Sequence, residues 1–158
     1  MALREIRILG DEILRKKCRK VEKIDDKILE LIQDMKDTMF ANDGVGIAAP
    51  QVGVLKRIVV VLHGKTPVVL INPVITSKEG RAVDQEGCLS VKKRIVDVAR
   101  PTKITVEALD ENGEEISFEA KDFYAREICH ELDHLDGILI VDREECVRKY
   151  VVAIEIAG

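Results

Sequence analysis

The segment His130-Glu131-Leu132-Asp133-His134 places two histidines four positions apart and a glutamate directly after the first. Residues with this spacing lie on one face of an α-helix, one turn from each other, so both imidazole rings can reach a single metal ion. Glu131 then lies where it can handle the proton of a metal-bound water. Because so short a pattern also arises by chance on charged helices, by itself it predicts a metal-binding helix without a stated purpose.

The residues around this segment have helical spacing from about Lys121 to Leu135, and Gly137 supplies the stop. The apolar contacts of this helix are expected from Phe123, Ile128, Leu132 and Leu135. Histidine is rare in the chain, which contains three, and two of them lie in this segment. The third, His63, is expected to be solvated in a turn.

Composition is that of an ordinary globular protein, with 46% hydrophobic and 34% charged residues and a net charge of −4 over 158 residues. We expect one domain over residues 1–158. Lysines and arginines are interspersed with acids, and no apolar run approaches the roughly 20 residues of a membrane span. Neither direct nucleic-acid binding nor a membrane location is therefore expected. The amino terminus has no signal or transit pattern, which favours the cytoplasm.

Further elements follow from periodicity and turn residues. Helices are expected at about Asp11–Cys18, with Ile13 and Leu14 facing inward, and at Asp25–Asn42. Strands are expected at Arg57–Leu62, Val68–Ile71, Arg94–Val98, Ile104–Leu109 and Ile116–Glu119, the last two joined by a hairpin at Asn112-Gly113. The segment from Asp142 to Gly158 fits either a helix or a strand. This order predicts an α+β domain with N-terminal helices, in which antiparallel or mixed sheets wrap the central metal-binding helix.

A catalytic metal site of this kind needs three protein ligands, so one more has to be found. Cys88, preceded by the flexible Gly87, is the best candidate, because a thiolate is a strong ligand for a divalent ion. Free cysteines also serve as small buried apolar residues, and spacing alone does not decide between these roles. Cys129 is the competing ligand, but it points about 100° away from His130 on the helix, which favours a core position. Cys18 and Cys146 are interpreted as core or surface residues.

A second segment with chemical potential is Gly44-Val45-Gly46-Ile47-Ala48-Ala49-Pro50-Gln51. Its small residues allow the backbone to approach a ligand closely, and Gln51 offers an amide donor. The glycines could equally serve only to turn a loop packed against a strand. A phosphate-binding loop is less favoured, because no lysine followed by serine or threonine occurs at the required spacing.

Together, the three segments resemble the motifs of the peptide deformylase family, in its bacterial form. Gly44–Gln51 is similar to its G-x-G-x-A-A-x-Q motif, Glu86–Ser90 to its E-G-C-L-S motif, and His130–His134 to its H-E-x-x-H motif. The order and separation of the motifs also agree, and the resemblance weakens after about Val141. Two positions depart from the family: Cys129 stands where glutamine is usual, and Lys92-Lys93 stands where proline is frequent.

The resemblance implies a metallo-hydrolase that cleaves the N-formyl group from the initiator methionine of new polypeptides and releases formate. It implies a metal held by Cys88, His130 and His134, whose bound water attacks the formyl carbon. Glu131 would be general base and then general acid, and Gln51 and the Leu89 N–H would donate to the oxyanion. The physiological ion implied is Fe²⁺, one per chain, with Zn²⁺, Ni²⁺ or Co²⁺ able to substitute.

Six residues are expected to contact the substrate: Gly44, Val45, Gly46, Glu86, Gly87 and Phe123. Among them Val45 and Phe123, together with Ile128, are candidates for holding a methionine side chain, although core packing is the commoner use of such residues. The expected partners are N-formyl-methionyl nascent peptides and, transiently, the ribosome. Two rival functions stay open: hydrolysis of a different acyl group by the same residues, and metal or peptide binding without turnover.

Overall fold

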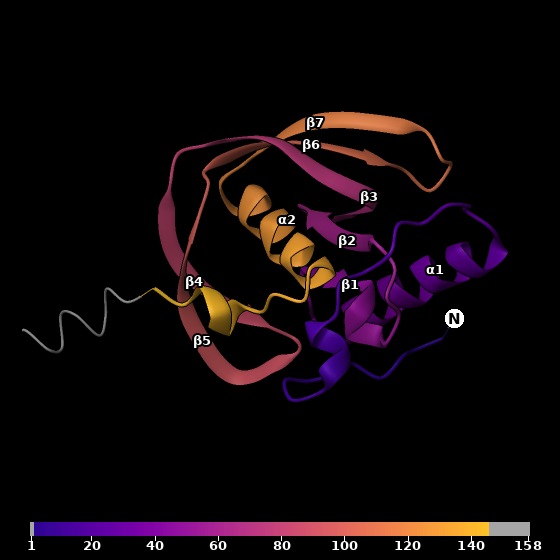
Figure 1. The fold of residues 1–158 in the computed structure, drawn as a ribbon, viewed down its shortest axis with the longest axis horizontal. Helices are drawn as coiled ribbons and strands as arrows, with labels where there is room; N and C mark the ends of the chain where they lie inside the picture. Colours follow the sequence, from indigo (N-terminus) through magenta and orange to yellow (C-terminus); the bar gives the residue numbers. More distant parts are fainter. Residues whose placement is uncertain (1, 146–158) are drawn as a thin grey trace, which may run out of the picture.

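In the computed structural model, which describes residues 2–145, the strands form two sheets around the helix that carries both histidines (Figure 1). The larger sheet is antiparallel with the strand order β1-β2-β3-β6-β7, and β4 and β5 form a separate two-stranded sheet. The strands are β1 Gly46–Ala48, β2 Ile58–His63, β3 Thr66–Glu79, β4 Ala82–Cys88, β5 Val91–Arg100, β6 Lys103–Leu109 and β7 Glu115–Lys121. The fold class predicted from the sequence is therefore correct.

Strand β2 owes its central place to a run of four apolar residues, Ile58 to Val61, all fully buried. Side chains alternate between the two faces of a strand, so this run supplies apolar side chains to both faces of the sheet. Val59 and Val61 belong to the core cluster that contains residues of the helix α2, Asp122–Leu135. Ile58 and Val60 belong to the cluster that contains residues of the helix α1, Asp26–Ala41. One face of the sheet is thus packed against each helix.

Helix α1 begins at Asp25, whose side chain accepts a hydrogen bond from the Ile28 N–H at 3.0 Å. Its inward face carries Leu31, Ile32, Met35 and Met39, as the periodicity predicts. The earlier predicted helix is shorter than expected. Only Glu12–Arg15 forms a 3-10 helix, η1, in which Leu14 is buried and Ile13 is half-buried.

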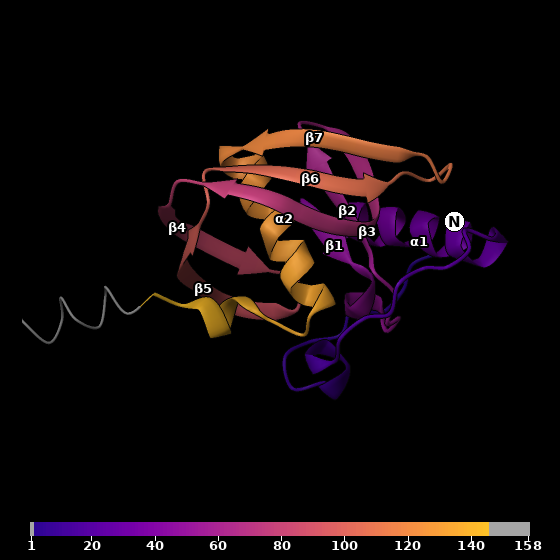
Figure 2. The ribbon, with the colours of Figure 1, turned by 45° about the horizontal axis from the view of Figure 1, so that its top comes forward.

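Helix α2 lies between the larger sheet and the β4–β5 pair, as two views of the molecule show (Figures 1 and 2). It ends at Leu135, and Gly137 adopts a left-handed conformation with φ +75°, which confirms the predicted stop. Most of its residues from Ala125 onward are buried, charged ones included. Burying charged side chains costs free energy unless they find partners, so those on α2 indicate a site.

The predicted strands are present, with boundaries that differ by a few residues, and the β6–β7 hairpin turns at Asp110–Glu114 with Gly113 at φ +78°. Strand β3 runs well beyond its predicted end, to Glu79. Two short 3-10 helices, η2 Ala49–Val52 and η3 Ile140–Arg143, were not predicted.

Two strands were missed. The segment Gly44–Gln51, expected to be a loop, contains β1, which pairs with Val59–Val61 along its full length. Strand β4 is missed because its first four residues are exposed and show no apolar alternation. Most of the ambiguous C-terminal segment, residues 146–158, lies outside the described residues. Among residues 2–145, no helix is long and apolar enough to cross a membrane.

Candidate metal centre

Three donor side chains converge where the end of β4 meets the middle of α2. The ligand atoms of Cys88, His130 and His134 all lie within 4.8 Å of one another. Cys88 Sγ and His134 Nε2 are 3.3 Å apart, and the two imidazole ring centroids are 5.3 Å apart. Both histidines are buried and Cys88 is half-buried. The helix spacing brings the histidines together, and the β4–β5 turn brings the thiol to them.

Glu86 fixes one of these histidines from behind. Its Oε1 lies 2.9 Å from His130 Nδ1, and its carboxylate also accepts two hydrogen bonds from Arg100, at 3.0 Å each, and one from Arg126 at 2.7 Å. Burial alone would raise the pKa of Glu86, but the hydrogen bonds to His130 and Arg100 and the charge of Arg100 outweigh it and lower the pKa to about 2. An ionised carboxylate only accepts, so His130 Nδ1 donates, and in the neutral imidazole Nε2 keeps the lone pair with which it can bind a metal ion.

This arrangement corrects the expectation that Glu86 contacts the substrate. Its side chain is 1% exposed and is occupied by Arg100, Arg126 and His130. The side chain therefore acts on the metal centre through a histidine. One signal of this role was available in the sequence, since an acidic residue two positions before a candidate ligand can orient another ligand.

Glu131 lies beside the three donors without being part of the group. It is 2% exposed, its Oε1 lies 4.0 Å from His134 Nε2, and that oxygen has no hydrogen-bond partner among the described residues. Burial raises the pKa of this carboxyl to about 8, with the Glu127 charge acting in the same direction. A buried carboxyl with an unused oxygen can take up a proton near neutral pH.

Gly46 makes room for this carboxylate. A Cβ atom on Gly46 would lie 2.5 Å from Glu131 Oε2, so a side chain at this position and Glu131 in its present position exclude each other. Gly44 is less constrained, because its added Cβ would meet the flexible end of Leu89 at 2.9 Å. The glycine at 46 is thus explained by close approach to the site and not by turning the chain.

Gln51 points its amide at the same group. Its Oε1 accepts from the Ala48 N–H at 2.9 Å, which orients the amide, and its Nε2 donates to Ser90 Oγ at 3.0 Å and to Cys88 Sγ at 3.7 Å. The side chain is 1% exposed. A fixed N–H donor therefore lies beside the Cys88 sulfur.

A cavity of about 290 Å³ opens onto these residues. It is lined by Asp43, Gly44, Val45, Gly46, Gln51, Gly87, Cys88, Leu89, Glu127, His130 and Glu131. Glu127, 8% exposed and with its pKa raised by burial, is a lining residue that the sequence analysis missed. It lies one helical turn before Glu131, and this spacing was the available signal.

Other candidates lie elsewhere. Phe123 is 60% exposed and is not among the lining residues, and Ile128 is fully buried in the core between α2 and the sheet. Cys129 and Cys18 belong to the same core cluster, and burial raises the pKa of both thiols, that of Cys18 to about 11. His63 is exposed, as expected, but its ring stacks on Tyr124 with centroids 4.2 Å apart.

Replacing Gly46 with alanine is expected to lower kcat/KM about 100-fold, because the new methyl group displaces the Glu131 carboxylate, and a shift near 1 Å costs roughly that much. Metal content should be unchanged. Gly44→Ala is the matched control and should lose much less activity, because the Leu89 side chain can move. Equal losses in the two variants, measured by steady-state kinetics, would contradict the assigned role of Gly46.

The family model for polypeptide deformylase matches residues 3–149. The chain belongs to this family. The family assignment confirms the resemblance seen in the motifs and the expected activity, the removal of the N-formyl group from nascent peptides. The chain is thus a metal-binding hydrolase of protein biosynthesis, and its three donors fit the metal dependence of the family.

Sequence and structure comparisons agree on the family. Peptide deformylase 1 of Clostridium acetobutylicum is 61% identical over 143 residues, which cover 90% of this chain and 95% of that protein. The crystal structure of the peptide deformylase from Thermotoga maritima matches with a TM-score of 0.90 and 40% identity, over 92% of this chain and 99% of that one. The Synechococcus elongatus deformylase, solved in complex with actinonin, matches with a TM-score of 0.87 and 41% identity, over 95% and 83%.

Proposed function

We propose that the chain removes the formyl group from N-formyl-methionyl peptides at the cavity that Cys88, His130, His134 and Glu131 line or border. The observation that carries this proposal is the position of Glu131: a buried carboxylate oxygen without a hydrogen-bond partner among residues 2–145, 4.0 Å from a histidine of the three-donor group. A merely structural acid would have been paired, as Glu86 is.

Cys88 Sγ and the two histidines would hold the metal ion. The set fits a divalent ion because the donors are a thiol and two imidazoles, and because Glu86 leaves the Nε2 lone pair of His130 free. When bound, the ion supplies Lewis acidity, which makes a water molecule a better nucleophile near neutral pH. We propose Fe²⁺ as the physiological ion, with Zn²⁺, Ni²⁺ or Co²⁺ able to replace it.

Glu131 carries the proton. Its free oxygen accepts a proton from the attacking water, and its buried position makes the protonated form accessible at neutral pH. Glu131 then donates this proton to the departing amine nitrogen, which leaves as the free amino terminus. The atoms balance: water supplies the hydroxyl of formate and the proton of the amine.

Two donors stabilise the formyl oxygen as it gains negative charge. Gln51 Nε2 lies beside Cys88 Sγ and is held in place by Ala48 and Ser90, so it is already oriented before the reaction begins. The backbone N–H of Leu89, which follows Cys88 directly and whose residue lines the cavity, is the second proposed donor.

The cavity walls select a small acyl group and a peptide that follows it. Gly44, Val45, Gly46 and Gly87 leave backbone close to the donors, and Val45 offers an apolar contact. Phe123, exposed in the first turn of α2 and one turn before the lining residue Glu127, is proposed as a contact beyond the cavity. We further propose that residues 1–158 act as one catalytic domain in the cytoplasm and meet nascent chains in transient contact with the ribosome.

Formate release tests the proposal directly. Anaerobically prepared, Fe²⁺-loaded protein should release formate from formyl-Met-Ala and leave acetyl-Met-Ala uncleaved. Preference for the acetylated peptide would instead support an amidase acting on a different acyl group. Protein with demonstrated bound iron and no formate release would show a binding protein without turnover.

A further inference from the structure

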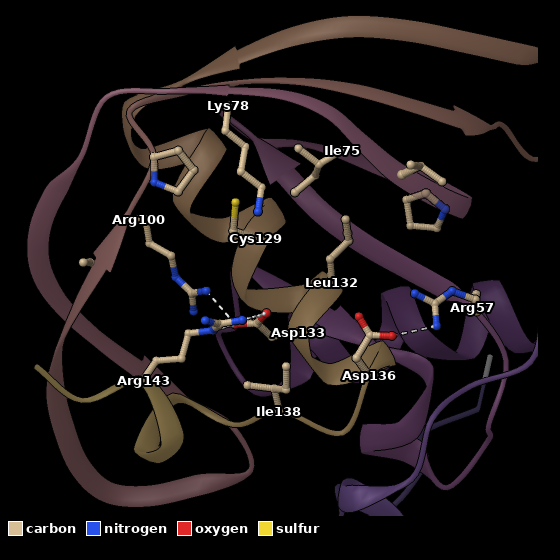
Figure 3. Close-up of a pocket in the computed structure, with 14 residues that line it drawn as sticks. Arg57, Ile75, Lys78, Arg100, Cys129, Leu132, Asp133, Asp136, Ile138 and Arg143 are labelled. Atoms are coloured by element: carbon tan, nitrogen blue, oxygen red, sulfur yellow. Dashed lines mark hydrogen bonds and ion pairs between the residues drawn. The ribbon is translucent and has the colours of Figure 1, made fainter.

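A second cavity, of about 380 Å³, lies against α2 and contains no residue of the three-donor group in its lining (Figure 3). Cys129, Leu132, Asp133 and Asp136 line it, and at 100° per residue they form a different face of α2 from the one that carries His130 and His134. Asp133 is the notable member, because two arginines converge on its carboxylate, as the dashed lines in Figure 3 show.

Charged side chains connect this cavity to the metal centre without a break. Arg143 donates to Asp133 through Nε at 2.7 Å and Nη2 at 3.0 Å. Asp133 Oδ2 also accepts from Arg100 Nη1 at 2.6 Å, and the other nitrogens of Arg100 bind Glu86 at 3.0 Å each. Glu86 in turn holds His130 Nδ1 at 2.9 Å. Four contacts therefore link Arg143 to a candidate ligand.

Burial falls steadily from the inner end of this chain to the outer one. The side chains of Glu86, Arg100, Asp133 and Arg143 are 1%, 4%, 15% and 44% exposed. Hydrogen bonds between charged groups are strongest where water is excluded, so the inner pairs are held firmly. Asp133, however, borders the cavity, and its two hydrogen bonds from Arg143 fix the orientation in which it meets Arg100.

We propose that Arg143 is a positioning residue for the metal centre, acting on His130 through Asp133, Arg100 and Glu86. Arg143 orients the Asp133 carboxylate, and this carboxylate fixes the Arg100 guanidinium. Arg100 in turn fixes Glu86, which sets the plane of the His130 ring. This inference rests on the proposed function, in that His130 is taken as a metal ligand.

The alternative is that Arg143 merely anchors the chain that follows α2. This segment is held by three other ion pairs: Arg15 with Asp142, Arg94 with Glu144 at 3.0 Å, and Arg81 with Glu145 at 2.9 Å. None of these three pairs contains a residue of the route to His130, that is, Arg143, Asp133, Arg100 or Glu86. Arg94, 50% exposed against 44% for Arg143, binds the residue that directly follows Arg143 and supplies the control.

The experiment uses full-length protein loaded with Co²⁺ and measures the rate at which the ion is lost to excess chelator, followed by visible absorption. A group bonded directly to a ligand is worth roughly 10- to 100-fold in metal affinity, and Arg143 acts three contacts further out, so Arg143→Met is expected to lose Co²⁺ about fivefold faster. Glu86→Gln should lose it faster still. Arg94→Met should match the wild type, and Arg143→Lys should recover part of the difference.

A second readout follows the histidine itself. In Zn²⁺-loaded protein, the His130 Nδ1 proton should exchange with water faster in Arg143→Met than in Arg94→Met, measured by NMR. Adding Arg143→Met to Asp133→Asn should cause no further change, because the route is already cut.

Equal ion loss in Arg143→Met and Arg94→Met would show that Arg143 only anchors the segment. An unchanged rate in Arg143→Met alongside a faster one in Glu86→Gln would exclude Arg143 from the route and overturn the proposal. Retention of Co²⁺ by Cys88→Ala would refute the proposed metal set itself, and with it the end point of the route. The failures of the two proposals are thus distinguishable.

Discussion

Glu131→Gln is expected to lower kcat about 10²- to 10⁴-fold, the usual contribution of a positioned proton carrier. The amide has nearly the shape of the carboxyl but cannot accept and return the proton. Glu131 lies outside the three-donor group, so the variant should bind the same amount of metal as the wild type. Its side chain also fits the space that Gly46 leaves, so the fold should be kept.

Kinetics and metal analysis on the same preparation check this prediction. Glu131→Ala should show the same loss of turnover with metal retained, which separates proton transfer from any effect of the introduced amide. A variant whose metal content collapses together with its activity would instead make Glu131 a ligand. Residual activity near that of the wild type would move the proton transfer to another group, and Glu127 would be the next candidate.

The second large effect is expected for Cys88→Ala, which should leave the protein with little bound metal and, as a consequence, little activity. Two imidazoles remain after the substitution, and the loss of the thiolate removes the strongest donor of the three. Metal content after purification with added Fe²⁺ or Co²⁺ is the measurement, with circular dichroism to verify the fold.

Cys129→Ala is the matched control, because it tests the other cysteine that neighbours a histidine. Cys129 is buried in the core between α2 and the sheet and is not in the three-donor group, so this variant should keep its metal. It should lose some stability instead, since a buried side chain is shortened. If Cys129→Ala lost metal and Cys88→Ala kept it, the assignment of the third ligand would be reversed.

The sequence predicts some parts of this site and not others, and the difference is how far apart the cooperating residues lie along the chain. His130 and His134 are recognisable because helix geometry alone places them on one face. Cys88 lies far from them in the chain, so residue chemistry makes it the best candidate without deciding its role, and the resemblance to a family then implies that it is a ligand. Glu86 was misplaced because its partners come from β5 and α2, which no local pattern joins to it.

The same reasoning explains the errors in the fold. The apolar run of β2 and the period of α1 are local signals and were interpreted correctly. Strand β4 has polar, exposed residues and forms because β5 offers it a partner. Strand β1 was missed because Gly46 suggests a turn, whereas this glycine lies in a strand and leaves room for Glu131. The route from Arg143 to His130 draws on four separate parts of the chain and has no signature in any of them.

The separation of the metal donors along the chain also ties ion binding to the stability of the native fold. Cys88 is the last residue of β4, whereas the two histidines lie on α2, the last long element among the described residues. The three donors therefore come together only where the end of β4 lies against α2 in the native fold. An ion that binds all three is expected to stabilise the folded chain against unfolding, so metal content and thermal stability should rise and fall together.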